Sequence, residues 1–190
     1  MSGGLLIGLA GRAGAGKSTV SFHLEDKHDF EPVAFAAPIQ AMIFALFNES
    51  GIDGAWCVER ELKELPSAIG PSYRELAQTL GTEWGRQLMG KEFWLRIALR
   101  KLQLARQHEA DVVISDVRFA NEAEWLRAQG GVLVRIDRRN ASAVRDHASE
   151  REGDTIAADH VIDNNGSLAV LHDQIDDLVE RLRQRLAVRA

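Results

Sequence analysis

A glycine-rich segment with one lysine is the strongest chemical signal in the sequence. It reads Gly11-Arg12-Ala13-Gly14-Ala15-Gly16-Lys17-Ser18-Thr19, which fits the spacing G-x-x-x-x-G-K-[ST] of a phosphate-binding loop. Glycines let backbone N–H groups turn toward a polyphosphate, and the positive end of a following helix faces the same anion. We expect Lys17 to reach the β- and γ-phosphates of a nucleotide and the Ser18 hydroxyl to bind Mg²⁺.

Asp116 is the second candidate for chemistry. It ends the β-branched run of residues 111–116, which is typical of a buried strand. In a chain with a phosphate loop, we expect a carboxylate in this place to bind Mg²⁺ directly or through water, with a helix cap or a structural ion pair as the alternative. Arg118, two residues on, suits a phosphate contact or a surface position.

Arginines gather in a weakly patterned segment near the end of the chain, from about 138 to 159. Arg138, Arg139, Arg145 and Arg151 lie there between two predicted strands. Cations that close over a phosphoryl-transfer site stabilise its developing charge and exclude water. The segment therefore predicts a lid, and a solvated loop is the alternative.

A third group of side chains suits the binding of a nucleotide acceptor. Aromatic rings stack on bases, glutamine reads a base edge and arginine holds a phosphate. The residues are Tyr73, Arg74, Gln78, Trp84 and Arg86. Tyr73 and Trp84 recur on an apolar helix face, where a core position is the commoner outcome, so the arginines and Gln78 are the stronger candidates.

The chemistry of the acceptor is indicated by a missing carboxylate. A hydroxyl acceptor needs a base, whereas a phosphomonoester, with a second pKa of about 6, is already a dianion near neutral pH. No unpaired carboxylate stands in residues 34–38, directly after the second predicted strand. This favours a phosphate group as the acceptor.

The pattern of apolar residues predicts the elements that must position these groups. Short apolar runs predict five strands, at 5–10, 31–36, 111–116, 132–136 and 160–163. Helical spacing predicts helices at 19–27, 38–47, 72–86, 92–108, 121–129 and 167–186, with an irregular segment at 55–71. Strands that alternate with helices predict an α/β fold with a parallel sheet covered on both faces.

Composition narrows the classes of function. The net charge of −5 gives no basic field for nucleic acid, and no run approaches the roughly 20 apolar residues of a membrane span. A single cysteine, Cys57, fits a reducing compartment such as the cytoplasm. The six histidines show no metal-ligand spacing along the chain. We therefore expect no nucleic-acid or membrane partner.

Several segments together resemble the deoxynucleoside monophosphate kinases of bacteriophages, a branch of the P-loop nucleoside monophosphate kinases. Besides the phosphate loop, the segments are Tyr73-Arg74-Glu75-Leu76, Gly81-Thr82-Glu83-Trp84-Gly85-Arg86, residues 114–123, His147-Ala148-Ser149-Glu150 and Asp163-Asn164-Asn165-Gly166-Ser167. The resemblance covers nearly the whole chain and implies one three-layer P-loop domain over residues 1–190. It also implies a helical acceptor-binding region at about 38–108 and a lid at about 138–159.

The same resemblance implies the reaction and the roles of residues. The reaction is transfer of the ATP γ-phosphoryl group to a deoxynucleoside monophosphate, with Mg²⁺ as cofactor. The enzyme would act in the cytoplasm, which is the host cytoplasm if the chain is phage-encoded. A homodimer is left open. Residues 11–19 with Asn164 and Asn165 would hold ATP, and Ser18 with Asp116 would hold Mg²⁺. Lys17, Asp116, Arg86, Arg138 and Arg139 would act in transfer. The acceptor would contact Phe35, Tyr73, Arg74, Gln78, Trp84, Arg86 and Arg118.

Three other interpretations compete with this one. Dephospho-CoA kinase shares the fold and the late Asn-Gly-Ser turn, but the acidic residue expected after its second strand is missing here. A GTPase is disfavoured because the sequence has no Asn-Lys-x-Asp motif and no Asp-x-x-Gly after the second apolar strand. A regulatory protein that binds ATP without turnover is the alternative from another class.

Overall fold

Five parallel strands form one sheet in the computed structural model, which describes residues 4–139 and 156–189. The strands are β1 (Leu6–Ala10), β2 (Glu31–Val33), β3 (Val112–Ile114), β4 (Val132–Asp137) and β5 (His160–Asp163). Their order across the sheet is β2-β3-β1-β4-β5, so the strand that leads into the phosphate loop is central. The five predicted parallel strands are confirmed, although β2 ends at Val33 rather than Ala36.

The residues of each strand fit its central or edge position in the sheet. All five residues of β1 are buried, as expected for a central strand covered on both faces. Pro32 has no N–H to donate, and it lies in β2, which is an edge strand paired only with β3. The register pairs Gly8 of β1 with Ile114 of β3, so the phosphate loop and the residues after β3 leave the sheet at the same edge.

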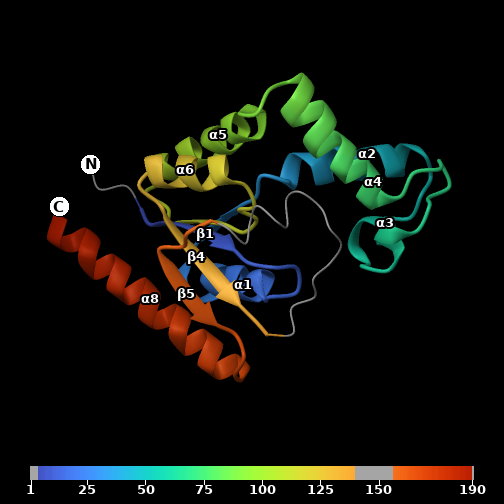
Figure 1. Cartoon of the computed structure of the whole chain (residues 1–190). Helices are drawn as coiled ribbons and strands as arrows, with labels where there is room; N and C mark the ends of the chain where they lie inside the picture. Colours follow the sequence, from blue (N-terminus) through green and yellow to red (C-terminus); the bar gives the residue numbers. More distant parts are fainter. Residues whose placement is uncertain (1–3, 140–155, 190) are drawn as a thin grey trace. The chain divides into compact units, whose positions relative to one another are not determined.

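Helices cover both faces of this sheet (Figure 1). On one face, α1 (Lys17–His28) and α8 (Leu168–Arg189) pack Val20, Leu24 and Leu171 against the strands. On the other face lies α6 (Ala120–Ala128), which packs so closely that a Cβ at Gly8 would stand 2.4 Å from Leu126 Cδ2. The three-layer α/β architecture expected from the sequence is confirmed.

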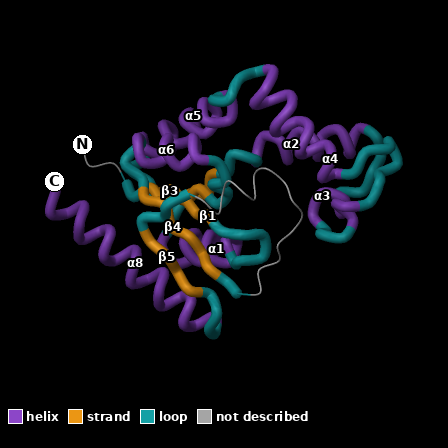
Figure 2. Tube along the Cα trace, viewed as in Figure 1, coloured by secondary structure: helices purple, strands orange, loops and turns teal. Residues whose placement is uncertain are grey.

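The chain divides into two compact units. The sheet unit consists of the chain up to Ala34 and from Leu99 onward, and the helical unit consists of Phe35–Ala98. The helical unit contains α2 (Ala37–Glu49), α3 (Ala55–Val58), the 3₁₀ turn η1 (Leu62–Glu64), α4 (Tyr73–Gln78), the π-helical η2 (Thr79–Leu88) and the start of α5 (Phe93–Gln107). Figure 2 shows how strongly helices predominate in it. The predicted helical region at about 38–108 overlaps this unit.

The helical unit has its own core. Ile39, Ile43 and Phe47 from α2 pack with Tyr73 of α4 and Trp94 of α5. A capping box formed by Ser72 and Glu75 begins α4. Ser72 N donates to Glu75 Oε2 at 2.8 Å, and Glu75 N donates to Ser72 Oγ at 3.1 Å.

Some predicted boundaries were wrong. The helix expected to end before Asn48 continues to Glu49, and residues 55–71 include two short helical turns rather than only irregular chain. The helix expected from Ser72 becomes π-helical at Thr79. Among the described residues, no helix combines the length and the apolar character needed to cross a membrane.

Candidate active site

The phosphate loop joins β1 to α1 in the strand–loop–helix context predicted from its sequence. Gly14 and Gly16 have φ angles of 79° and 105°, in the left-handed region that glycine adopts without strain. Space also requires glycine at position 16, because an added Cβ would lie 2.3 Å from Asn164 Nδ2. The loop therefore keeps its backbone close to a neighbouring turn and opens at Gly14, where an added Cβ would meet nothing within 4 Å.

Lys17, the first residue of α1, turns back over this loop. Its Nζ donates to Gly11 O at 2.5 Å and to Arg12 O at 3.0 Å. These bonds hold the ammonium group beside the loop amides, at the positive end of the helix. A lysine in this position contributes a fixed positive charge to an anion site.

Two oxygen donors lie near the loop, on different elements of the sheet unit. Ser18 is exposed at the second position of α1, and Asp116 is half-buried two residues beyond the end of β3. Val117 N donates a hydrogen bond of 3.1 Å to Leu9 O, which joins the segment that contains Asp116 to the carboxyl end of β1. A hydroxyl and a carboxylate form the kind of donor set that Mg²⁺ prefers.

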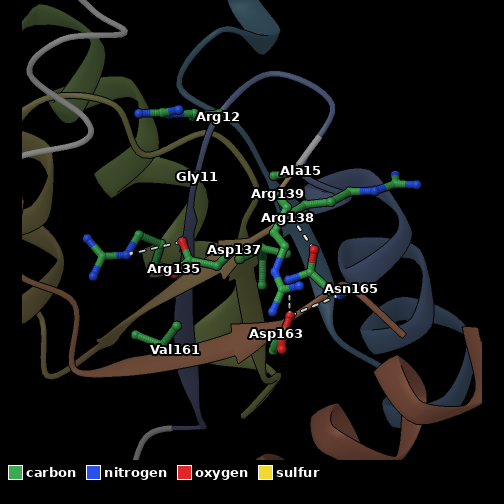
Figure 3. Close-up of a pocket in the computed structure, with 11 residues that line it drawn as sticks. Gly11, Arg12, Ala15, Arg135, Asp137, Arg138, Arg139, Val161, Asp163 and Asn165 are labelled. Carbon is green, nitrogen blue, oxygen red and sulfur yellow. Dashed lines mark hydrogen bonds and ion pairs between the residues drawn. The ribbon is translucent and has the colours of Figure 1, made fainter. Parts of the chain in front are cut away.

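The ends of β4 and β5 complete this edge of the sheet (Figure 3). Arg138, directly after β4, donates from Nη1 to Gly14 O at 3.5 Å, so its guanidinium group reaches the tip of the phosphate loop. Arg139 N donates to Asn165 Oδ1 at 2.9 Å, and Asn164 Nδ2 donates to Ala15 O at 2.8 Å. The structure thus brings the predicted residues Arg138, Arg139, Asn164 and Asn165 to the loop.

A pocket of about 620 Å³ opens at this edge. It is lined by the predicted residues Gly11, Arg12, Ala15, Arg138, Arg139 and Asn165 and by Arg135, Ile136, Asp137, Val161 and Asp163. Figure 3 shows the labelled side chains around it. Its cationic and amide groups suit a nucleotide, and its half-exposed valine offers an apolar surface.

Sequence reasoning missed Arg135 and Asp137 as site residues. They alternate on one face of β4, while Val134 and Ile136 point into the core on the other. Arg135 Nε is buried without a hydrogen-bond partner in the described part of the chain and lies 3.6 Å from Asp137 Oδ1. Period-two alternation near the carboxyl end of a parallel strand is the signal that could have identified them.

Arg118 lies on the sheet unit, and its side chain is exposed. Its backbone N donates to Glu122 Oε2 at 2.8 Å, and Phe119 N donates to the same oxygen at 3.1 Å. Glu122 therefore organises the start of α6, and it is only 5 % exposed.

The predicted acceptor residues belong to the helical unit. Phe35 and Tyr73 are buried, and Tyr73 packs edge-on to Phe47 with ring centroids 6.5 Å apart. Trp84 is half-buried and contacts Phe93, with centroids 5.3 Å apart. These rings contribute to the core of the unit, and a contact with an acceptor stays a prediction for them.

The polar members of this group are more accessible. Arg74 and Gln78 lie one turn apart on α4, and Arg74 Nε forms an ion pair with Glu64. Arg86 is half-buried in the π-helical η2. Segments of π-helix are rare and occur frequently at functional sites. Most of the predicted lid, including Arg145 and Arg151, lies outside the described residues.

Comparison with known proteins identifies relatives. The family model for deoxynucleotide monophosphate kinase matches residues 67–175. A putative deoxynucleotide monophosphate kinase of Acanthamoeba polyphaga mimivirus is 33% identical over 195 residues, covering 95% of this chain and 98% of the viral protein. The deoxynucleotide monophosphate kinase of Escherichia phage RB69 is 28% identical over 109 residues, covering 57% of this chain and 45% of the phage protein.

The structural comparison supports the fold. The crystal structure of TT1252 from Thermus thermophilus has a TM-score of 0.51 and 19% sequence identity, covering 95% of this chain and 98% of that one. At this identity the likeness concerns architecture alone.

Proposed function

Because the chain belongs to the deoxynucleotide monophosphate kinase family, we propose that it transfers the γ-phosphoryl group of ATP to a deoxynucleoside monophosphate. The products are ADP and the deoxynucleoside diphosphate. The observation that carries the proposal is the glycine loop with Lys17 folded over it, at the sheet edge where Asp116 and Arg138 also lie. The family match supplies the class of acceptor.

ATP would lie along the loop and the pocket beside it. The amides of residues 11–19 and the Lys17 ammonium group would hold the β- and γ-phosphates. Lys17 Nζ, which donates to Gly11 O and Arg12 O in this structure, would donate to phosphate oxygens instead. The turn at Asn164 and Asn165, together with the exposed Val161 of β5, would receive the nucleoside.

Magnesium fits the oxygen donors at this edge, namely the exposed Ser18 hydroxyl and the Asp116 carboxylate. Bound there, the ion would neutralise charge on the phosphates. Among the chain's own groups, Lys17, Arg138 and Arg139 would stabilise the charge that spreads over the transferring phosphoryl group. Arg138 already reaches Gly14 O, so little movement separates it from a phosphate on the loop.

The acceptor would be held by the helical unit. Arg86 and Arg74 would pair with its phosphate, and Gln78 would contact the base; Arg118 on the sheet unit is a further candidate. Tyr73 and Trp84 would limit the space around the sugar, and Phe35 would be a further contact of the acceptor. No general base is required, because the attacking phosphate oxygen is already deprotonated near neutral pH.

The proposal is tested by ADP formation from ATP and Mg²⁺ with each deoxynucleoside monophosphate, each ribonucleoside monophosphate and dephospho-CoA. We expect turnover with at least one deoxynucleoside monophosphate and a lower kcat/KM with the matching ribonucleotide. ADP formed only with dephospho-CoA would contradict the proposal. Tight ATP binding without turnover on any acceptor would favour a regulatory ATP-binding protein instead.

A further inference from the structure

Three potential metal ligands meet between α1 and α8, on the face of the sheet away from α6. His23 and His28 come from α1, and Asp176 comes from α8. Spacing along the chain did not reveal this group, because Asp176 stands 148 residues after His28. The group is separate from Ser18, Asp116 and the phosphate loop in both position and donor type.

The distances suit a shared ion. Asp176 Oδ1 lies 2.8 Å from His23 Nε2 and 2.7 Å from His28 Nε2, and one ligand atom from each residue lies within 4.8 Å of the others. Zinc holds nitrogen and oxygen ligands at about 2.0–2.2 Å, which places tetrahedral ligand atoms roughly 3.3 Å apart. Small side-chain movements, with the Nε2 protons of the two histidines released to solvent or replaced by protonation at Nδ1, would therefore open the present hydrogen-bonded arrangement around an ion.

Packing already fixes the imidazole rings. The side chain of His23 is only 9% exposed, and that of His28 is 12% exposed. The ring of His23 stacks on that of His172, with centroids 3.9 Å apart and planes 17° apart. Ligands held in this way lose little side-chain freedom when an ion binds.

Asp176 supplies the negative charge, and its two oxygens have different partners. Both histidines contact Oδ1, while Lys27 Nζ donates to Oδ2 at 2.5 Å. Oδ1 can thus bind an ion while Oδ2 keeps its hydrogen bond, as is usual for ligating carboxylates. The carboxylate is 26% exposed, which leaves a path for water or an incoming ion.

We propose that His23, His28 and Asp176 form a binding site for one divalent transition-metal ion, and that zinc fits it best. Two imidazole nitrogens and one carboxylate oxygen favour zinc over Mg²⁺ or Ca²⁺, which prefer oxygen ligands. The ion links α1, which begins at the phosphate loop, to α8, which follows the turn at Asn164 and Asn165. His23 lies six residues along α1 from Lys17, roughly 9 Å at 1.5 Å per residue, so the ion stabilises the fold without touching the phosphates.

The test uses the full chain, stripped with EDTA and free of nucleotide. Calorimetric titration with ZnCl₂ should give one ion per chain at this site, and Co²⁺ should give the visible absorption of a four-coordinate ion. At zinc 100-fold above Kd, the unfolding midpoint should rise by roughly 5–10 °C. MgCl₂ at the same concentration should leave the midpoint unchanged.

Two variants and a matched control locate the site. His28→Gln and Asp176→Asn should lose the bound ion and the rise in midpoint, whereas His108→Gln, at an exposed histidine after α5, should keep both. X-ray absorption of the zinc-loaded wild-type protein should show two imidazole ligands, which tests the site even if a variant fails to fold. The proposal is wrong if zinc does not shift the wild-type midpoint, or if both variants bind it as tightly as wild type.

Discussion

Lys17 is the residue on which the proposed chemistry depends most. Its ammonium group contacts two loop carbonyls, Gly11 O and Arg12 O, and stands where a terminal phosphate would bind. We predict that Lys17→Met lowers kcat by at least about 10²–10³-fold, as expected when a preorganised electrostatic partner is removed from a transition state. Steady-state ADP formation measures the loss.

Lys101→Met is the matched control, because Lys101 is exposed on α5 outside the proposed site. It should leave the rate unchanged. A Lys17→Met enzyme that keeps its rate within tenfold of wild type would contradict the role assigned to the loop lysine.

A substitution at Arg86 tests whether this residue binds the acceptor nucleotide rather than ATP. A charged hydrogen bond contributes about 1.5–3 kcal/mol, so Arg86→Ala should raise the KM for the deoxynucleoside monophosphate by roughly 10–100-fold. The KM for ATP should change less than about twofold, since the proposal assigns the ATP phosphates to the loop and Lys17 and assigns Arg86 to the acceptor.

The measurement is a pair of substrate titrations, with each nucleotide varied at saturating concentration of the other. Arg96→Ala removes an exposed arginine of α5 that pairs only weakly with Glu92, at 3.6 Å, and should alter neither KM. Equal losses for both nucleotides in Arg86→Ala would contradict an acceptor role.

At the residue scale, motif chemistry pointed to the loop residues and to Asp116, because both are tied to short segments next to predicted strands. The turn at Asn164 was implied only by the family resemblance. Arg135 and Asp176 were not predicted. Arg135 comes to the pocket through strand alternation, and Asp176 meets His23 and His28 only after α8 packs on α1. The contact of Asp176 with the two histidines leaves no local trace in the sequence, because it joins distant segments.

At the scale of elements, the helical unit depends on close packing between η2 and α5. Trp94 Nε1 donates to Gly81 O at 2.9 Å, and the indole lies against Gly85. The indole therefore leaves no room for a side chain at Gly85. Apolar periodicity predicted a helix here but not its π geometry, since side-chain spacing does not report the backbone hydrogen-bond pattern.

Gly85 and Gly81 offer a matched pair of substitutions. A Cβ at Gly85 would lie 2.3–2.5 Å from atoms of the Trp94 indole, which is rigid and only 5% exposed. A Cβ at Gly81 would lie 3.2 Å from Ile39 Cδ1, the flexible end of a side chain. We predict that Gly85→Ala lowers the free energy of unfolding by about 1–3 kcal/mol.

Gly81→Ala should be neutral or stabilising by up to about 1 kcal/mol, because alanine has the higher helix propensity. Urea unfolding followed by tryptophan fluorescence measures both variants. Equal effects of the two substitutions would show that the indole does not determine the requirement for glycine at 85.

At the scale of the whole molecule, the parallel sheet was predictable because each strand is a short apolar run and each crossover contains a helical pattern. The division into two units did not follow from apolar spacing; only the family resemblance implied a helical region, at about 38–108. Residues 35–98 have the same helical periodicity as the helices that cover the sheet, so apolar spacing alone could not show that Ile43, Phe47 and Trp94 form a separate core.

The pH dependence of the free energy of unfolding tests whether His160 is half-buried in the sheet unit as the structure shows. Burial lowers the pKa of His160 at the start of β5, and the positive charges of Arg185 and Arg181 lower it further. The negative charge of Asp159 raises this pKa and so partly opposes the shift. In the unfolded chain His160 takes up a proton near its ordinary pKa of about 6.5, whereas in the folded chain it does so only at lower pH. The contribution of neutral His160 to stability is fully present above about pH 6.5 and is lost as the pH falls through the lower, folded-state pKa.

We predict that His160→Gln reduces the loss of stability between pH 7.5 and pH 5.5, because glutamine cannot take up the proton. Urea unfolding at the two pH values, followed by far-UV circular dichroism, gives the difference for each protein. His108→Gln is the control: its histidine is exposed after α5, so the pH dependence should match that of wild type. If His160→Gln also matched wild type, β5 would not carry the proton linkage that its burial implies.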